Sequence, residues 1–266
     1  DNAKVKEIED YYARCAVEGS NEYQIEESQK AVAHLDVILG DPDRLHAVAQ
    51  DFIQHYETRV SEGATIAGKA LFVCANRYIA YNFYKLLIEM RPEWGVKKIC
   101  PDGVKVSDKE KKDLKPIEMV QLVMTRNKDD EPKLYNMLGT KEDRKELDRQ
   151  FKNIKSNFKI AIVVDMWLTG FDVPFLDTIY IDKPIQQHTL IQTISRVNRT
   201  YAGKDKGLIV DYIGIKKNMN EALAKYTNFE TGEFEGIDQC VTIVKDQLEI
   251  LSHMFNRFDS SKFFIG

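Results

Sequence analysis

Long apolar runs, paired cysteines and clustered histidines are all missing from this sequence. No apolar stretch among its 266 residues approaches the roughly 18 residues of a membrane-spanning helix. The four cysteines form no CxxC pair, and the five histidines follow no metal-ligand spacing. These absences predict a protein with no membrane span and no zinc site, in a reducing compartment such as the cytoplasm. The cysteines are Cys15, Cys74, Cys100 and Cys240.

The amino terminus lacks a recognisable targeting signal. Its first residues, DNAKVKEIEDYY, are polar and do not follow the pattern of a signal peptide. They include no initiator methionine, so we expect the chain to be a fragment of a longer protein.

The sequence has little excess charge of either sign. Its 38 basic and 42 acidic residues give a formal net charge of -4. A domain that binds nucleic acid through its overall charge would be strongly basic. Any contact with nucleic acid must therefore use a local basic track.

A convincing phosphate-binding loop is also missing, although one stretch spells the consensus. Residues 63–69 read GATIAGK and match GxxxxGK, but Ala70 stands where a serine or threonine would bind Mg²⁺. The stretch precedes an apolar run, whereas a phosphate loop follows a strand and opens a helix. We interpret it as a flexible loop. No acidic DExH-type motif is present either.

A nuclease-like pattern lacks the surroundings that catalysis needs. PD at 101–102 and EKK at 110–112 together spell PD…ExK. Two-metal cleavage requires such acids to be held together by a folded core. Here they lie in a charge-rich stretch without apolar strands, which favours a solvated charge run.

From residue 69 onward, short apolar runs alternate with amphipathic segments. This alternation predicts an α/β fold whose parallel sheet is covered by helices on both faces. Ligands of such sheets bind beyond the carboxyl ends of the strands, where we expect the loop around residue 170. Loops are expected at 57–68 and 101–116. The expected strands are 70–75, 96–100, 117–124, 160–164, 178–181 and 207–214, and the expected helices are 78–90, 141–153 and 188–198.

Three regions differ in their patterning. Residues 1–65 are expected to be a helical linker, in which Pro42 begins a helix with apolar residues at helical spacing. Residues 66–215 hold the alternation of strands and helices. Residues 216–266 are expected to begin a separate helical region. The apolar residues after Pro42 are Leu45, Val48, Ala49, Phe52 and Tyr56.

The helix expected at 188–198 has the clearest chemistry. Gln192, Arg196 and Arg199 stand at i, i+4 and i+7 and would share one face. Arginine suits a polyphosphate because its fixed fork of donors matches phosphate oxygens. The spacing alone is equally that of a basic, solvated helix face. The residues expected to pack on the sheet are Leu190, Ile191, Ile194 and Val197.

Several motifs, in order, resemble those of a known family. TGFDVP at 169–174 and QTISRVNR at 192–199 resemble motifs V and VI of superfamily 2 helicases and translocases. They are more similar still to the motor (R) subunit of type I restriction enzymes, whose motif IV resembles GKALFVCANR at 68–77. Ordered motifs are more specific than any single one. The resemblance covers roughly residues 50–215 and implies a second RecA-like motor domain at 66–215.

The resemblance implies an ATP site shared between two RecA-like domains. Mg²⁺ would be held mainly by the first domain. Arg196 and Arg199 would contact the γ-phosphate, and Gln192 would help to position the phosphate or the attacking water. Gly170 would allow a close backbone approach, and Asp172 would accept a hydrogen bond from the ribose or fix the loop.

DNA contacts and protein partners are implied as well. Thr169, Asn76 and Arg77 would lie near the DNA backbone, as suits a motor that moves along any sequence. The implied partners are duplex DNA, the first RecA-like domain of the same subunit, and the methyltransferase and specificity subunits. Without phosphate-loop and nuclease motifs, the chain is expected to be inactive alone, as part of an ATP-dependent type I deoxyribonuclease.

Two other functions stay open. One is a domain of a different superfamily 2 helicase that acts on RNA or unwinds duplexes. The other is a non-catalytic module whose helical tail docks the methyltransferase partner. In the second case the arginine helix would have no reason to face a cleft.

Overall fold

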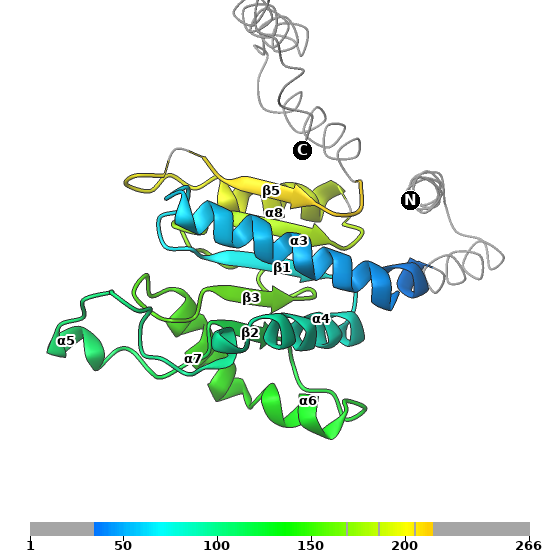
Figure 1. The fold of residues 1–266 in the computed structure, drawn as a ribbon, viewed down its shortest axis with the longest axis horizontal. Helices are drawn as coiled ribbons and strands as arrows, with labels where there is room; N and C mark the ends of the chain where they lie inside the picture. Colours follow the sequence, from blue (N-terminus) through cyan, green and yellow to red (C-terminus); the bar gives the residue numbers. More distant parts are fainter. Residues whose placement is uncertain (1–34, 169, 186, 205, 215–266) are drawn as a thin grey trace, which may run out of the picture. The chain divides into compact units, whose positions relative to one another are not determined.

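Five short strands form one parallel sheet in the order β2-β3-β1-β4-β5 (Figure 1). The computed structural model describes residues 35–168, 170–185, 187–204 and 206–214. The chain divides into two units, Asp1–Ala222 and Leu223–Gly266, and all of these residues belong to the first. The strands are β1 Ala70–Cys74, β2 Val120–Val123, β3 Ile160–Val163, β4 Thr178–Asp182 and β5 Leu208–Asp211.

The three central strands end at the same level. β1 lies between β3 and β4, with Val73 paired to Val163 on one side and Cys74 to Asp182 on the other. Every residue of these three strands is buried, as in a parallel sheet covered on both faces. The predicted α/β fold is therefore confirmed.

Helices cover both faces of the sheet (Figure 1). α3 and α4 lie over one face and α7 and α8 over the other. For α4, α7 and α8, which connect strands, this is the arrangement that right-handed crossovers require. On the α3 face, the ring of Phe52 packs edge-on against those of Phe72 and Tyr180, at centroid distances of 5.2 and 4.6 Å. The longer helices are α3 Pro42–Ser61, α4 Arg77–Met90, α7 Lys141–Phe151 and α8 Gln187–Val197. The shorter ones are η1 Pro92–Gly95, α5 Asp108–Lys111 and α6 Pro132–Met137.

α3 begins at the predicted proline. The Asp41 side chain caps the helix by accepting a hydrogen bond from the Arg44 amide at 2.9 Å, and Pro42 occupies the first turn. All five apolar residues predicted to line this helix are buried. The helix continues to Ser61, so the loop expected at 57–68 is wrong over its first part. No glycine or proline stands before Gly63 to end the helix earlier.

The start of α3 is tied to the sheet by an ion pair. The Arg44 guanidinium forms a two-pronged pair with Asp182, the fully buried last residue of β4. The side chains of α3 contribute to the same hydrophobic core as the sheet. The division of the chain at residue 65 stays a prediction.

The segment 96–137 differs from expectation. The strand expected at 96–100 is wrong, because only a single antiparallel bridge joins Lys98 to Ile117. The loop expected at 101–116 contains α5, which starts with a reciprocal capping box between Ser107 and Glu110. α6 was not predicted. Local side-chain hydrogen bonds, and not apolar periodicity, set the structure of these short polar pieces.

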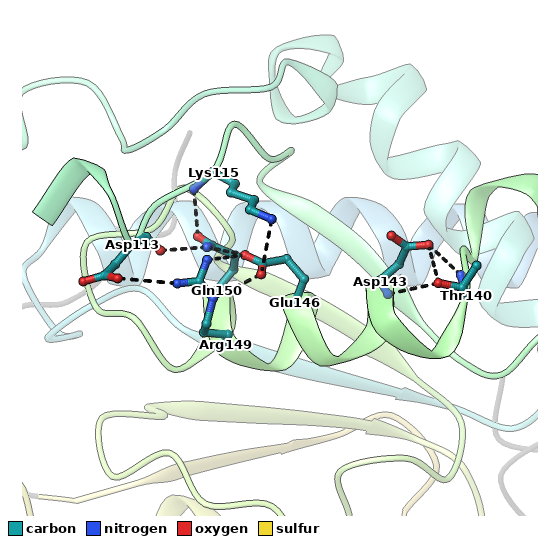
Figure 2. A network of polar contacts seen from close by, with 7 residues as sticks. All are labelled: Asp113, Lys115, Thr140, Asp143, Glu146, Arg149 and Gln150. Carbon is teal, nitrogen blue, oxygen red and sulfur yellow. Dashed lines mark hydrogen bonds and ion pairs between the residues drawn. The ribbon is translucent and has the colours of Figure 1, made fainter.

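Polar side chains fix α7 at both ends (Figure 2). Thr140 and Asp143 form a reciprocal capping box at its start. In its last turn, the buried Gln150 amide donates to the Asp113 carbonyl oxygen at 3.0 Å and accepts from the Lys115 amide at 3.4 Å. These bonds hold the end of α7, which contacts the loop that follows β3.

Candidate functional site

α8 confirms the predicted helix and packs on the sheet through one side. Leu190 and Val197 are buried. The Asn198 amide donates the last helical hydrogen bond, to the Ile194 carbonyl oxygen at 3.2 Å. A Cβ on Gly207 would lie 2.2 Å from the Val197 carbonyl oxygen, so the chain that leads into β5 passes directly over the helix end.

The second arginine is held by an acid from the preceding loop. Arg199 lies two residues beyond α8, so the expectation that it shares a helical face with Gln192 and Arg196 is wrong. Its Nε lies 3.5 Å from the Oδ1 of Asp172, and the two side chains are 49% and 53% exposed. A pair this exposed stabilises the fold by only ~0–1 kcal/mol. Its effect is to orient the guanidinium and to join the 169–174 loop to the arginine motif.

The first arginine has a donor that no described residue meets. Arg196 lies in the last turn of α8 and is partly exposed. Its Nε is buried and has no hydrogen-bond partner among the described residues. A buried donor without a partner costs about 1–3 kcal/mol.

The loop between β3 and β4 starts at the carboxyl edge of the sheet and then folds back. Lys183, just after β4, donates to the Val164 carbonyl oxygen at 3.1 Å. Farther along, the Phe171 ring lies 6.0 Å from the ring of Phe151, the last residue of α7. α7 runs antiparallel to β3 and ends near the amino ends of the strands. The loop was expected beyond the carboxyl ends of the strands. This is right for its start, but wrong for Phe171, which lies by the end of α7.

Two residues in the left-handed backbone region shape this loop. Gly170 is exposed and has φ 69°, which glycine adopts at little cost. Trp167 has φ 70° and is the one non-glycine residue with positive φ in the described ranges. Sequence reasoning missed Trp167. Two aromatic residues four positions apart across a glycine, Trp167 and Phe171, were the available signal. Thr169 lies outside the described residues.

Asn76 and Arg77, the expected DNA contacts, have internal roles at the start of α4. The Asn76 side chain caps the helix by accepting from the Ile79 amide at 2.9 Å. The Arg77 guanidinium pairs with Asp130 through both oxygens and donates to the Thr125 carbonyl oxygen at 2.7 Å. Both residues lie just beyond the carboxyl end of β1. Their contact with DNA stays a prediction.

The 63–69 stretch precedes β1, and its last residue is part of the core. Lys69 is fully buried. Its ammonium donates to the Phe158 carbonyl oxygen and lies 5.0 Å from the centroid of the Phe151 ring. Burial lowers the pKa of Lys69 well below its ordinary value. A lysine held in this way does not reach a phosphate, which agrees with the prediction that residues 63–69 are not a phosphate-binding loop.

The acids of the nuclease-like pattern are engaged separately. Asp102 pairs with Lys98 at 2.5 Å, and Glu110 pairs with Lys155 at 2.6 Å. The hydrogen bond from Lys155, aided by those from Ser107, lowers the pKa of Glu110 to about 2. Within the described ranges, no three metal-binding side chains gather, and no helix is long and apolar enough to cross a membrane.

The sequence matches a described family over the region that forms this site. Residues 67–214 match type I restriction enzyme subunit R domain 3. The chain is 34% identical over 236 residues to the type I restriction enzyme HindI endonuclease subunit of Haemophilus influenzae, covering 86% of this chain and 20% of that protein. It is 44% identical over 82 residues to the SauCOLORF180P endonuclease subunit of Staphylococcus aureus, covering 29% of this chain and 9% of that protein.

One of the similar solved structures is also described as part of a type I restriction enzyme. A fragment described as an HsdR subunit of a type I restriction enzyme from Vibrio vulnificus is 15% identical, with a TM-score of 0.46, and the match covers 77% of this chain and 31% of that one. The chain spans about a fifth of the length of the Haemophilus influenzae relative. The match over residues 67–214, with the Haemophilus influenzae relative, shows that the chain belongs to the type I restriction enzyme R subunits.

Proposed function

We propose that the chain is the second motor domain of an ATP-dependent DNA translocase, within the R subunit of a type I restriction enzyme. It would face a first RecA-like domain of the same subunit, with ATP between the two. One observation carries the proposal. The loop and arginine motifs meet where Asp172 contacts Arg199, and Arg196 lies nearby in the chain, in the last turn of α8.

Two guanidinium groups in this position would serve transfer of the γ-phosphoryl group. Negative charge on that group is stabilised in the transition state, and an arginine that reaches it from a neighbouring domain contributes about 10³–10⁵ in rate. Arg199 is exposed and already oriented, which suits it to reach across a cleft. Arg196 is partly exposed and would add a second guanidinium when the domains close, and Gln192 would position the phosphate or the attacking water.

The loop would supply the remaining contacts to ATP. The Asp172–Arg199 pair supports a role for Asp172 in fixing the arginine and its loop, in place of a ribose contact. Nothing lies within 4 Å of a Cβ built on Gly170, so the backbone there is open to a ligand. Mg²⁺ would be held mainly by the first domain, because the described residues here offer no cluster of metal ligands.

Contacts with duplex DNA would follow the carboxyl edge of the sheet. Asn76 and Arg77 lie there, and Thr169 is the proposed contact from the neighbouring loop. Asp130 neutralises Arg77 in part, so its contribution to phosphate binding would be smaller than that of a free arginine. Backbone contacts of this kind carry no sequence information, which suits translocation along any DNA.

The proposed mechanism is a switch between two domain arrangements. ATP would bridge the two domains and close the cleft, and loss of the γ-phosphate would release the arginines and open it. Alternating grip would move the subunit along DNA in the cytoplasm. The methyltransferase and specificity subunits are the proposed partners, and residues 216–266, outside the described ranges, are the proposed docking region.

Substitution of Arg199 tests this function. In the complete R subunit, Arg199→Ala should lower the kcat of DNA-dependent ATP hydrolysis by about 10³-fold or more, because it removes a transition-state contact. Thermal unfolding should be nearly unchanged, since the pair with Asp172 is exposed. Steady-state ATPase assays with saturating duplex DNA, alongside circular dichroism melting, measure both quantities.

Arg91→Ala is the matched control. Arg91 is also a partly exposed arginine, paired with Glu57 at 2.7 Å and with Glu93 at 3.9 Å, but it follows α4 and lies away from α8. Its substitution should leave the ATPase rate unchanged. A folded Arg199→Ala subunit with normal turnover would show that Arg199 has no role in hydrolysis.

A further inference from the structure

One residue of the β3–β4 loop adopts a backbone conformation that its side chain disfavours. Trp167 has φ 70°, in the left-handed region that bulky residues rarely occupy. Such conformations persist only where the surrounding structure imposes them. The contacts of the indole ring, and not backbone preference, must therefore hold this part of the loop.

The indole is held by a layered aromatic contact. Its ring stacks on that of Phe171 with centroids 4.1 Å apart and planes inclined by 2°. The Phe151 ring lies 5.2 Å from the indole on another side. The Lys152 ammonium lies 4.9 Å from the centroid of the Phe171 ring. Trp167 is only 9% exposed, so the stack is shielded from water.

The stack closes the loop on itself. Trp167 and Phe171 are four residues apart, and Gly170 between them also has a left-handed φ of 69°. These two left-handed positions turn the chain so that the rings meet. Phe171 immediately precedes Asp172, whose carboxylate contacts Arg199. A continuous chain of contacts therefore runs from the indole to the guanidinium.

We infer that Trp167 is a positioning residue for Arg199. By stacking on Phe171 it fixes the place of Asp172, and Asp172 in turn sets the direction of the guanidinium. The inference rests on the proposed function of Arg199 in ATP hydrolysis. Trp167 touches no substrate itself, so its loss should disturb the geometry of the transition state more than the binding of ATP.

The test uses three variants of the complete R subunit in DNA-dependent ATPase assays. Trp167→Leu and Phe171→Leu remove the stack and should lower kcat roughly 10- to 100-fold, with the KM for ATP changed less than about 3-fold. Trp167→Phe keeps a ring that can stack, and should retain kcat within about 3-fold of the unchanged protein. Rescue by phenylalanine but not by leucine distinguishes stacking from general core packing.

Trp94→Phe is the control. Trp94 is also a buried tryptophan but packs against Phe52 and Tyr56 on the other face of the sheet. Its substitution should leave kcat unchanged.

Because the sequence has two tryptophans, the Trp94→Phe variant also leaves Trp167 as the sole indole fluorophore. In that background, Phe171→Leu should change the emission of Trp167 in the chain itself, and an unchanged spectrum would argue against the stack in solution.

A double variant tests the route of the effect. If Trp167 acts through Asp172, then Trp167→Leu should lower kcat little further in an Asp172→Asn background. Full additivity would overturn the proposed route.

If Arg199→Ala is inactive while folded Trp167→Leu and Phe171→Leu subunits keep normal kcat, the positioning role fails and the proposed function stands. Normal turnover by Arg199→Ala defeats the proposed function itself. Should Trp167→Leu not fold, Phe171→Leu and Trp167→Phe decide the matter.

Discussion

Single buried charges distinguish this core from an ordinary apolar one. Lys159 immediately precedes β3 and is 8% exposed. Its ammonium donates to the Ile154 carbonyl oxygen at 3.0 Å and has no carboxylate partner among the described residues. Burial lowers the pKa of Lys159 to about 8. Near neutral pH the folded protein therefore holds a charge that water would solvate better.

This lysine should make stability depend on pH. Between about pH 8 and 10.5 the folded state has released the Lys159 proton while the unfolded state still binds it, so this group's contribution rises with pH. Below pH 8 both states are protonated and the contribution is constant at its least favourable value. The Lys159→Met variant lacks the effect. Its free energy of unfolding relative to the unchanged chain should therefore fall by roughly 1–3 kcal/mol between pH 7 and pH 10.5.

Urea unfolding of the chain at several pH values measures this difference. Lys97→Met provides the control, because Lys97 is exposed and its ammonium stays in contact with water in the folded protein. Ionisable groups that do not interact with Lys159 are common to both proteins and cancel. A flat difference for Lys159→Met would mean that its ammonium is solvated in the folded state.

The candidate site was predictable from sequence at some residues and not at others. The arginines and the loop glycine were found because their types and order match a motif. The Asp172–Arg199 contact was not, because helical periodicity cannot show that α8 ends at Val197 and that Gly207 crosses its end. The stack of Trp167 was missed for a similar reason, since it depends on a left-handed backbone position that no local propensity favours.

At the scale of elements, α3 is held to the sheet by apolar packing and by the Arg44–Asp182 pair. Asp182 is fully buried, whereas Arg44 is 16% exposed. Removing one partner of such a pair leaves a buried charge without compensation, which costs about 3–5 kcal/mol. We therefore expect Arg44→Ala to lower the free energy of unfolding by about that amount.

Urea titration of the chain, followed by circular dichroism, checks this expectation. The control is Arg91→Ala, whose partner Glu57 is 41% exposed and whose loss should cost at most ~1 kcal/mol. Equal effects of the two substitutions would mean that α3 is attached loosely to the sheet. The proposed boundary at residue 65 would then gain support as a separation of folding units.

The elements that sequence predicted best are those with long or continuous apolar patterns. Three of the six expected strands correspond closely to β1, β3 and β4, because they are short apolar runs buried on both faces. β2 and β5 each lie within a longer expected strand. The strand expected at 96–100 does not form, because two lysines interrupt this short segment and only one of its residues bridges to another segment. α5 and α6 depend on a capping box and a first-turn proline, which act over too few residues to give a period.

At the scale of the whole molecule, the proposed function gives the chain one side of an ATP site. Its arginines and loop have the chemistry to contact a phosphate, but Lys69 is buried and the described residues hold no cluster of metal ligands. The chain also spans about a fifth of its Haemophilus influenzae relative. Under the proposed function, hydrolysis would require residues beyond the described ranges.

ATP hydrolysis should therefore be absent from the 266-residue chain and present in the complete R subunit. We expect no turnover by the chain with or without duplex DNA, because arginines alone do not bind Mg²⁺ or cradle the β- and γ-phosphates. The complete subunit should hydrolyse ATP in a DNA-dependent manner, and Lys69→Met should leave that rate unchanged, since Lys69 serves packing. Turnover by the chain alone that disappears in Lys69→Met would instead make residues 63–69 a phosphate loop, which would require Lys69 to leave its buried place against Phe151 and reach solvent.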